Sequence, residues 1–529
     1  MTAAPRPDPA ESIARLTETQ GDGCGDMDPE TFRAAGHAVV DLIADYLAAV
    51  EGYPVLPPVE PGTIAPRFPA AAPETPEPLA AILADYRRLV EPNATHWQHP
   101  GFFAYFPTTA SGPGILGEFL TAGLGQNPML WRTSPIGTEL EVVVVGWLRR
   151  ALGLPDDFDG FLTDTASTSS LIALAAAREA VGIEAAALGL DGRAGMGRVD
   201  ADRAGSGQGD DDGVAPFGDL RVYASAEAHS SIDKAAMTLG LGRASVVRVP
   251  VDDAFRLRVD ALRAAIAADR AAGRRPLAIV ATLGTTSSTS VDPVAELADV
   301  AAEQGLWLHV DAAYAGAAAL VPEYRSAFAG WERADSIVVN PHKWWFTPLD
   351  ASLLLTRRMA DLRAAFSLVP EYLRTLDRAA PVRDVSEYTP QLGRRFRALK
   401  LWVQLRWFGL DGLRRRIRHH VELARRFAEW VDADPDWERL APVPFSTVCF
   451  RWRPADRSET EASAADLDAA NERILAAVNA SGEVFLSHTR LDGRFTLRLA
   501  VGNLRTEARH VERAWALLRE AAAAVGEGR

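Results

Sequence analysis

The stretch Val338-Val-Asn-Pro-His-Lys-Trp-Trp345 combines an apolar run, a proline and a lysine that stands between a histidine and two tryptophans. The apolar run has the pattern of a buried strand, so Lys343 is expected directly after a strand end. Burial among aromatic side chains lowers the pKa of an amine and makes it a nucleophile. A lysine at a strand end can equally extend to the solvent. The stretch alone leaves both interpretations open.

Further β-rich runs precede this stretch, with helical patterns between them. The predicted strands are 220–224, 245–249, 277–282, 306–310 and 336–339. Several are apolar on both faces, as expected for a parallel sheet that helices cover on each side. We therefore predict an α/β fold whose ligands gather at the carboxyl ends of the strands.

Polar residues follow four of these runs. His229, Thr286, Asp311 and Lys343 each lie just beyond a different predicted strand, with Thr285 beside Thr286. An acid beside a pyridine nitrogen keeps that nitrogen protonated, and pyridoxal phosphate (PLP) requires this pairing of an acid with a lysine. A lone acid at a strand end is commonly a helix cap, but Asp311 together with Lys343 favours PLP chemistry.

The content of lysine supports this interpretation. Only three of the 56 basic residues are lysines, namely Lys234, Lys343 and Lys400. Arginine neither forms an imine nor loses its proton at working pH, so a lysine kept in such a background is a candidate for chemistry. Chance would still explain one or two of the three.

Two motifs are weaker. Thr165-Ala-Ser-Thr-Ser-Ser170 precedes a strong helix former, and the free N–H groups of a helix start bind phosphate. An ordinary N-cap has the same sequence pattern. His229 could stack on a cofactor ring, although a lone histidine is more often a packed residue.

Composition excludes several other classes. A net charge of −14 argues against nucleic acid as a partner. The arginine-rich stretches 393–397 and 413–418 carry apolar residues at helical spacing, which favours solvated helix faces. No metal-ligand cluster, serine hydrolase motif or Walker loop is found, and no apolar window spans a bilayer. The start of the sequence lacks the pattern of a signal peptide, so we expect a cytoplasmic protein.

Local patterns define further elements. Residues 28–50 predict an amphipathic helix capped by Asp28 with Pro29 in its first turn. Residues 114–178 have a helical pattern with short breaks. After residue 417, runs at 443–451, 483–486 and 495–500 suggest strands of a smaller α+β domain.

Six motifs in the same order resemble the aromatic-L-amino-acid decarboxylases, which belong to the group II pyridoxal-dependent decarboxylases. The resemblance runs from about residue 27 to near the C-terminus. The motifs are Thr95-His-Trp-Gln-His-Pro-Gly-Phe-Phe-Ala-Tyr-Phe-Pro107, Ala228-His-Ser-Ser231, Ala281-Thr-Leu-Gly-Thr-Thr286, His309-Val-Asp-Ala-Ala-Tyr-Ala-Gly316, Asn340-Pro-His-Lys-Trp344 and Leu392-Gly-Arg-Arg-Phe-Arg397.

The resemblance implies a fold type I, aminotransferase-like PLP enzyme with a mainly parallel seven-stranded sheet. It implies a homodimer with active sites at the subunit interface. The implied organisation is a disordered leader (1–26), an N-terminal dimerisation segment (27–112), a large PLP domain (113–416) with a flexible insertion (187–219), and a small C-terminal domain (417–529).

The resemblance also assigns roles. Lys343 would hold the cofactor covalently, Asp311 would pair with its pyridine nitrogen and His229 would stack on its ring. The remaining cofactor-binding residues implied are Thr165, Ala166, Ser167, Thr286, Ala313, Asn340 and His342.

Tyr372 matches a tyrosine on a mobile loop that protonates the α-carbon after carbon dioxide leaves. Relatives with phenylalanine at this position are aldehyde synthases, so Tyr372 favours simple decarboxylation. The implied substrate-binding residues are Trp97, Tyr105, Pro107, Thr108, Asn127, Met129 and Gly393.

Two stretches depart from the family pattern. Asn127 and Met129 replace an isoleucine and a phenylalanine that the partner subunit supplies to the pocket in animal enzymes. The phosphate loop begins Asp164-Thr-Ala-Ser-Thr-Ser where Gly-Ser-Ala-Ser-Glu-Ala is usual. Gly393 stands where histidine decarboxylases of the family carry serine, which leaves room for a larger ring.

The expected activity is decarboxylation of an aromatic L-amino acid of the Trp, Tyr, Phe or DOPA class. The alternatives are an oxidative aldehyde synthase on the same scaffold, a decarboxylase of a non-aromatic amino acid, and a non-catalytic dimeric scaffold. The last should lack one of Lys343, Asp311, His229 or Tyr372, and the sequence contains all four.

Overall fold

The computed structural model describes residues 26–182, 185–190, 219–368, 383–455 and 461–527. Most of the expected leader, most of the insertion and the whole loop that contains Tyr372 lie outside these ranges. The chain forms two compact units, Met1–His96 and Trp97–Arg529. The domain boundaries expected at residues 112 and 416 stay predictions.

The first unit is built from helices with little core of their own. Its α-helices are α2 (Pro29–Ala49) and α3 (Leu79–Asp85). As predicted, Asp28 caps α2, because its carboxylate accepts hydrogen bonds from the N–H groups of Glu30 and Thr31. Leu42 is the buried residue of α2, whereas Phe32 and Val40 are exposed.

The second unit contains the predicted α/β sheet, which has seven strands in the order β1-β7-β6-β5-β4-β2-β3. All neighbouring strands are parallel except where β7 pairs with β6 and β1. The strands are β1 (Asp159–Thr163), β2 (Leu220–Ser225), β3 (Val246–Val249), β4 (Arg275–Thr282), β5 (Trp307–Asp311), β6 (Ser336–Val339) and β7 (Ser352–Thr356).

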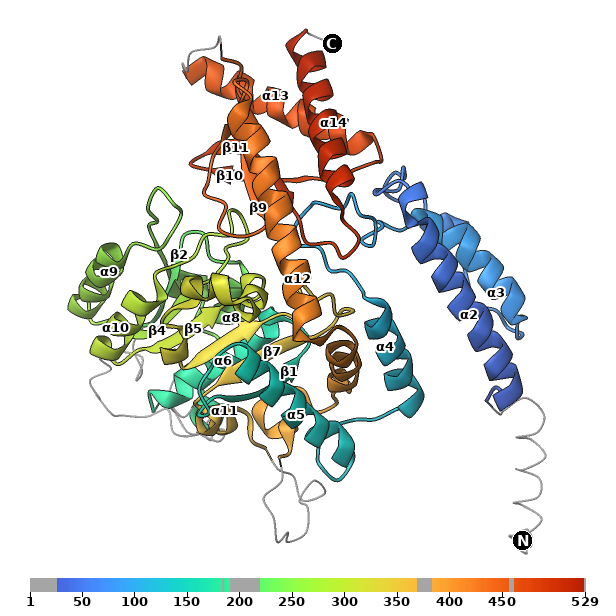
Figure 1. Cartoon of the computed structure of the whole chain (residues 1–529). Coiled ribbons are helices and arrows are strands. Elements are labelled where there is room, and N and C mark those ends of the chain that lie inside the picture. Colours follow the sequence, from blue (N-terminus) through green and yellow to red (C-terminus); the bar gives the residue numbers. More distant parts are fainter. Residues whose placement is uncertain (1–25, 183–184, 191–218, 369–382, 456–460, 528–529) are drawn as a thin grey trace, which may run out of the picture. The chain divides into compact units, whose positions relative to one another are not determined.

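Helices cover both faces of this sheet (Figure 1). The helices of this part of the unit are α4 (Gly112–Leu124), α5 (Pro135–Ala151), α6 (Ala166–Ala180), α7 (Ala185–Leu188), α8 (Ser231–Thr238), α9 (Val259–Ala271), α10 (Val294–Gln304), α11 (Met359–Phe366) and α12 (Arg397–Ala433). One core packs α5, α9, α10 and α12 against the sheet, and a second core packs α6, α8 and α11. Strands buried on both faces explain their continuous apolar sequences.

A four-stranded antiparallel sheet, in the order β10-β11-β9-β8, follows within the same unit. Its elements are β8 (Trp437–Arg439), β9 (Thr447–Trp452), α13 (Glu461–Ala480), β10 (Ser487–Leu491), β11 (Arg494–Ala500) and α14 (Ala508–Gly526). Helix α12 leads into it and is kinked at Gly409, whose φ of 60° favours glycine. Within the described residues, none of the helices has the length and apolarity needed to cross a membrane.

The sequence predictions differ from the structure at three strands. Strand β1 lies inside the segment expected to be helical, and β7 was not predicted. The strand expected at 483–486 is instead β10, at Ser487–Leu491. Phe485, within the expected strand, forms only an isolated bridge with Phe102. Short apolar runs do not distinguish a strand from a helix segment, and the more polar β10 lacks a strong strand signal.

Candidate active site

One cavity of about 240 Å³ lies at the carboxyl ends of the central strands. Its walls come from the end of β4, the end of β5, the turn after β6 and the start of α6. The lining residues are Phe106, Thr165, Ala166, Ser167, His229, Ser231, Thr282, Gly284, Thr286, Asp311, Ala313, Tyr314, Asn340, His342 and Lys343.

Lys343 contributes an amine to this cavity. Its Nζ lies 5.2 Å from the centroid of the Phe106 ring and forms no hydrogen bond or ion pair with any residue that the structure describes. Burial lowers the pKa of Lys343, and the nearby carboxylate of Asp311 opposes that shift without cancelling it. A larger share of neutral amine is therefore available as a nucleophile.

Asp311 ends β5, next to the end of β4. The strand register places it opposite Thr282 of β4 and Val338 of β6, and Asn340 follows two residues beyond Val338. The carboxylate is buried, and its Oδ1 accepts a hydrogen bond of 3.1 Å from the N–H of Ala313. The parallel register therefore brings an acid and an amine, 32 residues apart in the chain, into one cavity.

The start of α6 forms another side of the cavity. Thr165 is the N-cap, and its hydroxyl accepts from the N–H of Thr168 at 3.4 Å. The N–H groups of the first helical turn have no partner within the helix, and the helix dipole favours an anion there. Asn340 Oδ1 is also buried without a hydrogen-bond partner among the described residues. Such an unpaired amide group is consistent with a ligand contact.

His229 lines the cavity and is exposed to solvent. Its Nδ1 accepts a hydrogen bond of 3.1 Å from the N–H of Ser231, so a neutral ring carries its proton on Nε2. Desolvation lowers the pKa of His229, with Asp311 acting in the opposite direction. The ring is therefore mainly neutral at pH 7 and can donate from Nε2.

All the predicted cofactor-binding residues line this one cavity. None of the predicted substrate-binding residues does so. Trp97 stacks on Phe102 and lies 6.3 Å from Tyr105, centroid to centroid, and Pro107 and Thr108 continue that segment. Asn127, Met129 and Gly393 form a separate group, in which Asn127 Oδ1 accepts from the N–H of Arg394 at 2.9 Å. Tyr372 lies outside the described residues.

Sequence reasoning missed five lining residues: Phe106, Ser231, Thr282, Gly284 and Tyr314. All five lie inside quoted motifs, yet none had been given a role. Thr282 is the last residue of β4. Gly284 has a φ of +89°, and a Cβ there would lie 2.5 Å from Ala315 Cβ. Both features require glycine at this wall.

These residues fit PLP. The cavity contains a partner for each reactive part of PLP. The anion site suits the phosphate, the amine suits the aldehyde, and the buried carboxylate suits the pyridine nitrogen. Together with a mainly parallel seven-stranded sheet, they define a fold type I PLP-dependent enzyme.

The comparison with protein families agrees. The model of the pyridoxal-dependent decarboxylase conserved domain matches residues 61–191 and 208–453. The chain belongs to the pyridoxal-dependent decarboxylase family and is a PLP-dependent carboxy-lyase.

Relatives cover nearly the whole chain. The chain is 40% identical over 505 residues to phenylacetaldehyde synthase of Arabidopsis thaliana, and the alignment covers 94% of this chain and 96% of that protein. It is 39% identical over 518 residues to a tryptophan decarboxylase of Camptotheca acuminata, covering 96% and 98%. A crystal structure of a TDC of Oryza sativa with PLP and tryptamine has a TM-score of 0.85 and 36% identity, covering 94% and 99%.

Proposed function

We propose that this protein removes the carboxyl group of an aromatic L-amino acid, with PLP held on Lys343, and releases the amine and carbon dioxide. The observation that carries the proposal is the meeting of Lys343 and Asp311 in one cavity with the helix start at Thr165. Support for the aromatic class comes from relatives named tryptophan and tyrosine decarboxylases.

PLP, when bound, supplies an electron sink for the carbanion that the departing carboxyl group leaves. Lys343 would hold the cofactor through its amine, and Asp311 would lie at the pyridine nitrogen and favour its protonated form. The start of α6, with Thr165, Ala166 and Ser167, would hold the phosphate together with Asn340 and His342.

Two residues act on the substrate in this proposal. His229 would donate from Nε2 to the substrate carboxylate and so orient the bond that is to be broken. Tyr372 is the expected proton donor to the α-carbon, on the sequence argument alone.

The competing reaction is oxidative aldehyde formation. It is favoured by 40% identity to a phenylacetaldehyde synthase, a value similar to that for the decarboxylases. The tyrosine at position 372 favours decarboxylation instead. A decarboxylase of a non-aromatic amino acid is the third possibility.

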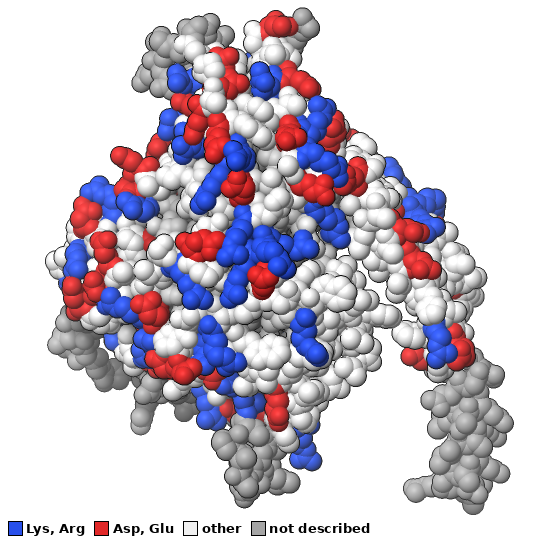
Figure 2. All heavy atoms as spheres, viewed as in Figure 1, with Lys and Arg blue, Asp and Glu red and all other residues white. Residues whose placement is uncertain are grey.

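We also infer a homodimer. The exposed apolar residues of α4 include Leu116, Leu120 and Leu124, and those of α5 include Ile136 and Val142. The surface over α4 carries few charged side chains in Figure 2. Exposed apolar faces of this kind mark protein interfaces, and a second copy also fits the poorly buried helix α2. Light scattering should give twice 57.0 kDa, and a monomeric mass would contradict this inference.

A panel assay tests the reaction. Purified holoenzyme is incubated separately with Trp, Tyr, Phe, DOPA, His and Glu, and amine, carbon dioxide, aldehyde, ammonia and peroxide are measured. We expect amine and carbon dioxide in equal amounts from at least one aromatic substrate. Aldehyde with ammonia and peroxide would support the synthase, and turnover of His or Glu alone would overturn the aromatic class. The cytoplasmic location stays a prediction that cell fractionation can test.

A further inference from the structure

Lys400 is a buried lysine that the proposed chemistry does not use. It lies on α12 and its side chain is 0% exposed. Arg397 and Gln404 lie three residues before and four residues after it, so all three side chains share one face of the helix. Arg397 and Gln404 are buried as well. The sequence interpretation of 393–397 as a solvated helix face was therefore wrong: Arg394 and Arg397 are both buried, and α12 begins only at Arg397.

Each member of this stripe donates to a different acceptor in the segment after Lys343. Gln404 Nε2 donates to the carbonyl oxygen of Trp345. Lys400 Nζ donates to the carbonyl oxygen of Pro348 at 3.0 Å. Arg397 Nε donates to Asp350 Oδ1 at 2.7 Å. The stripe thus follows residues 345–350 in order along the helix.

The charge of the stripe is balanced beside it. Lys400 Nζ also contacts a carboxylate oxygen of Glu118 on α4, and Glu118 accepts from Arg395 Nε at 3.1 Å. A buried ammonium group without partners would be costly, so its position here depends on these acceptors. Loss of one donor would leave a buried carbonyl unsatisfied and loosen the segment at that point.

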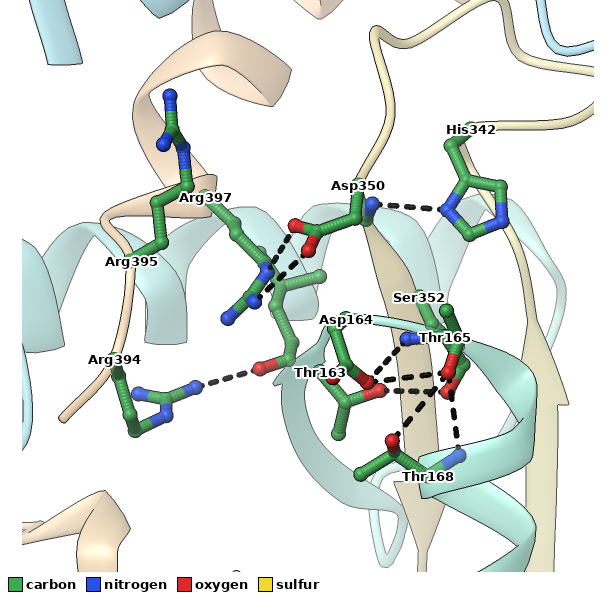
Figure 3. Close-up of polar contacts among 12 residues, drawn as sticks. Thr163, Asp164, Thr165, Thr168, His342, Asp350, Ser352, Arg394, Arg395 and Arg397 are labelled. Carbon is green, nitrogen blue, oxygen red and sulfur yellow. Dashed lines mark hydrogen bonds and ion pairs between the residues drawn. The ribbon is translucent and has the colours of Figure 1, made fainter. Parts of the chain in front are cut away.

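The residue that follows this segment, Ala351, is hydrogen-bonded to His342, which lines the cavity. The N–H of Ala351 donates to His342 Nδ1 at 2.9 Å, and the N–H of His342 donates back to the oxygen of Ala351 at 3.3 Å. Figure 3 shows Arg397 and His342 approaching the turn at Asp350 from opposite sides. Because Nδ1 accepts, a neutral His342 carries its proton on Nε2.

We propose that Arg397, Lys400 and Gln404 are positioning residues that hold segment 345–350, so that His342 presents its Nε2 proton and Lys343 keeps its place in the cofactor cavity. They act through the segment and touch neither substrate nor cofactor. The inference rests on the proposed placement of PLP at Lys343 and is independent of which amino acid is the substrate.

Two stripe variants and one matched control test this. Lys400→Met removes the donor and keeps most of the apolar stem, and Gln404→Met does the same without changing charge. Arg415→Gln is the control, because Arg415 pairs with Asp411 on the exposed face of the same helix. The dissociation constant of PLP is measured for each apoenzyme, with the melting temperature of the apoenzyme recorded beside it.

We expect each stripe variant to weaken PLP binding by about tenfold, as the loss of a buried hydrogen bond to a charged or constrained partner does. Arg415→Gln should leave PLP binding unchanged. A lower melting temperature with unchanged PLP binding would overturn the proposal, because the stripe would then be merely structural. If Lys400→Met does not fold, the PLP affinity of Gln404→Met tests the proposal in the same way.

A double-mutant cycle separates positioning from general loosening. In a His342→Asn background, the stripe variants should weaken PLP binding by less than they do in the unchanged protein, because the part of their effect that passes through His342 is already lost. An equal loss in both backgrounds would contradict that route. Lys343→Ala tests the premise that PLP is held on Lys343. PLP binding that is unchanged in this variant would overturn the placement of PLP at Lys343. None of these readouts uses an amino acid substrate.

Discussion

The two edges of the central sheet each carry a cavity, and they differ in how their charged groups are paired. The cavity at the amino end of β5 is the larger, at about 510 Å³ against about 240 Å³. Its three arginines all form ion pairs: Arg333 with Asp299 at 2.8 Å, Arg357 with Asp157 at 3.1 Å, and Arg358 with Asp335 at 3.1 Å. At the carboxyl ends of the strands, Lys343 has no ion-pair partner among the described residues. Volume therefore does not identify the active site, whereas a buried cation without an ion pair does.

The largest expected effect is on kcat, and it distinguishes Lys343 from Arg333. Lys343→Ala should reduce kcat by about a thousandfold or more, because the group that holds the cofactor is lost. Arg333→Gln, at the other edge, should leave kcat within about twofold, because surface substitutions away from a site have small effects. Steady-state assays of both variants check this. Comparable losses in the two would remove the distinction between the edges.

The next prediction compares two acids. Asp311→Asn should lower kcat by about a hundredfold or more, because an amide cannot keep the pyridine nitrogen protonated. Asp335→Asn should keep kcat but lose about 1–3 kcal/mol of unfolding free energy. Asp335 accepts from the N–H of Leu308 at 2.8 Å and from Arg358, so its role is structural. Activity assays give kcat and urea unfolding gives the free energy of unfolding for both variants. An Asp335→Asn variant that is stable but inactive would contradict the structural role of Asp335.

A smaller effect concerns pH. Burial and the charge of Lys343 lower the pKa of His342 from 6.5 to about 3. Between these values the unfolded chain binds the proton that the folded chain does not, so unfolding free energy should rise with pH from about 3 to about 6.5. His420 and His309, with pKa values lowered to about 3 and about 4 by burial, add to this slope.

His342→Gln should remove one histidine from that slope and flatten it, whatever the variant does to stability at neutral pH. Urea unfolding at several pH values between 4 and 6.5 measures the slope. The control is His488→Gln, because His488 stacks on Phe495 in the four-stranded antiparallel sheet. An unchanged slope for His342→Gln would show that folding does not lower the pKa of His342.

The smallest effect concerns Gly393. A Cβ at this position would meet only Asn127 Nδ2, at 3.9 Å, so Gly393→Ser should fold with an unchanged melting temperature. If Gly393 borders the substrate pocket, the ratio of kcat/KM between Trp and the smaller aromatic rings should change by about tenfold. An unchanged ratio would place Gly393 outside the pocket.

The sequence predicted the carboxyl edge better than the rest of the molecule. Lys343, Asp311 and Thr165 could be found because each follows or begins an element with a strong apolar pattern, and parallel strands deliver their ends to one edge. Strands β1 and β7 could not be found, because β1 has the sequence DGFLT and β7 the sequence SLLLT, and apolar runs this short do not distinguish a strand from a helix segment. The stripe on α12 was also missed, since its acceptors lie some 50 residues away and the chain alone does not show that the two segments meet.

The central claim is that Lys343 carries the cofactor, and the sequence allows a direct test because only three lysines are present. Holoenzyme is reduced with borohydride, which fixes the cofactor to its lysine, and is then digested and mapped by mass spectrometry. We expect the pyridoxyl mass on the peptide that contains Lys343, and none on those of Lys234 and Lys400. Labelling of Lys234 or Lys400 in place of Lys343, or of no lysine in a holoenzyme that is active, would contradict the account.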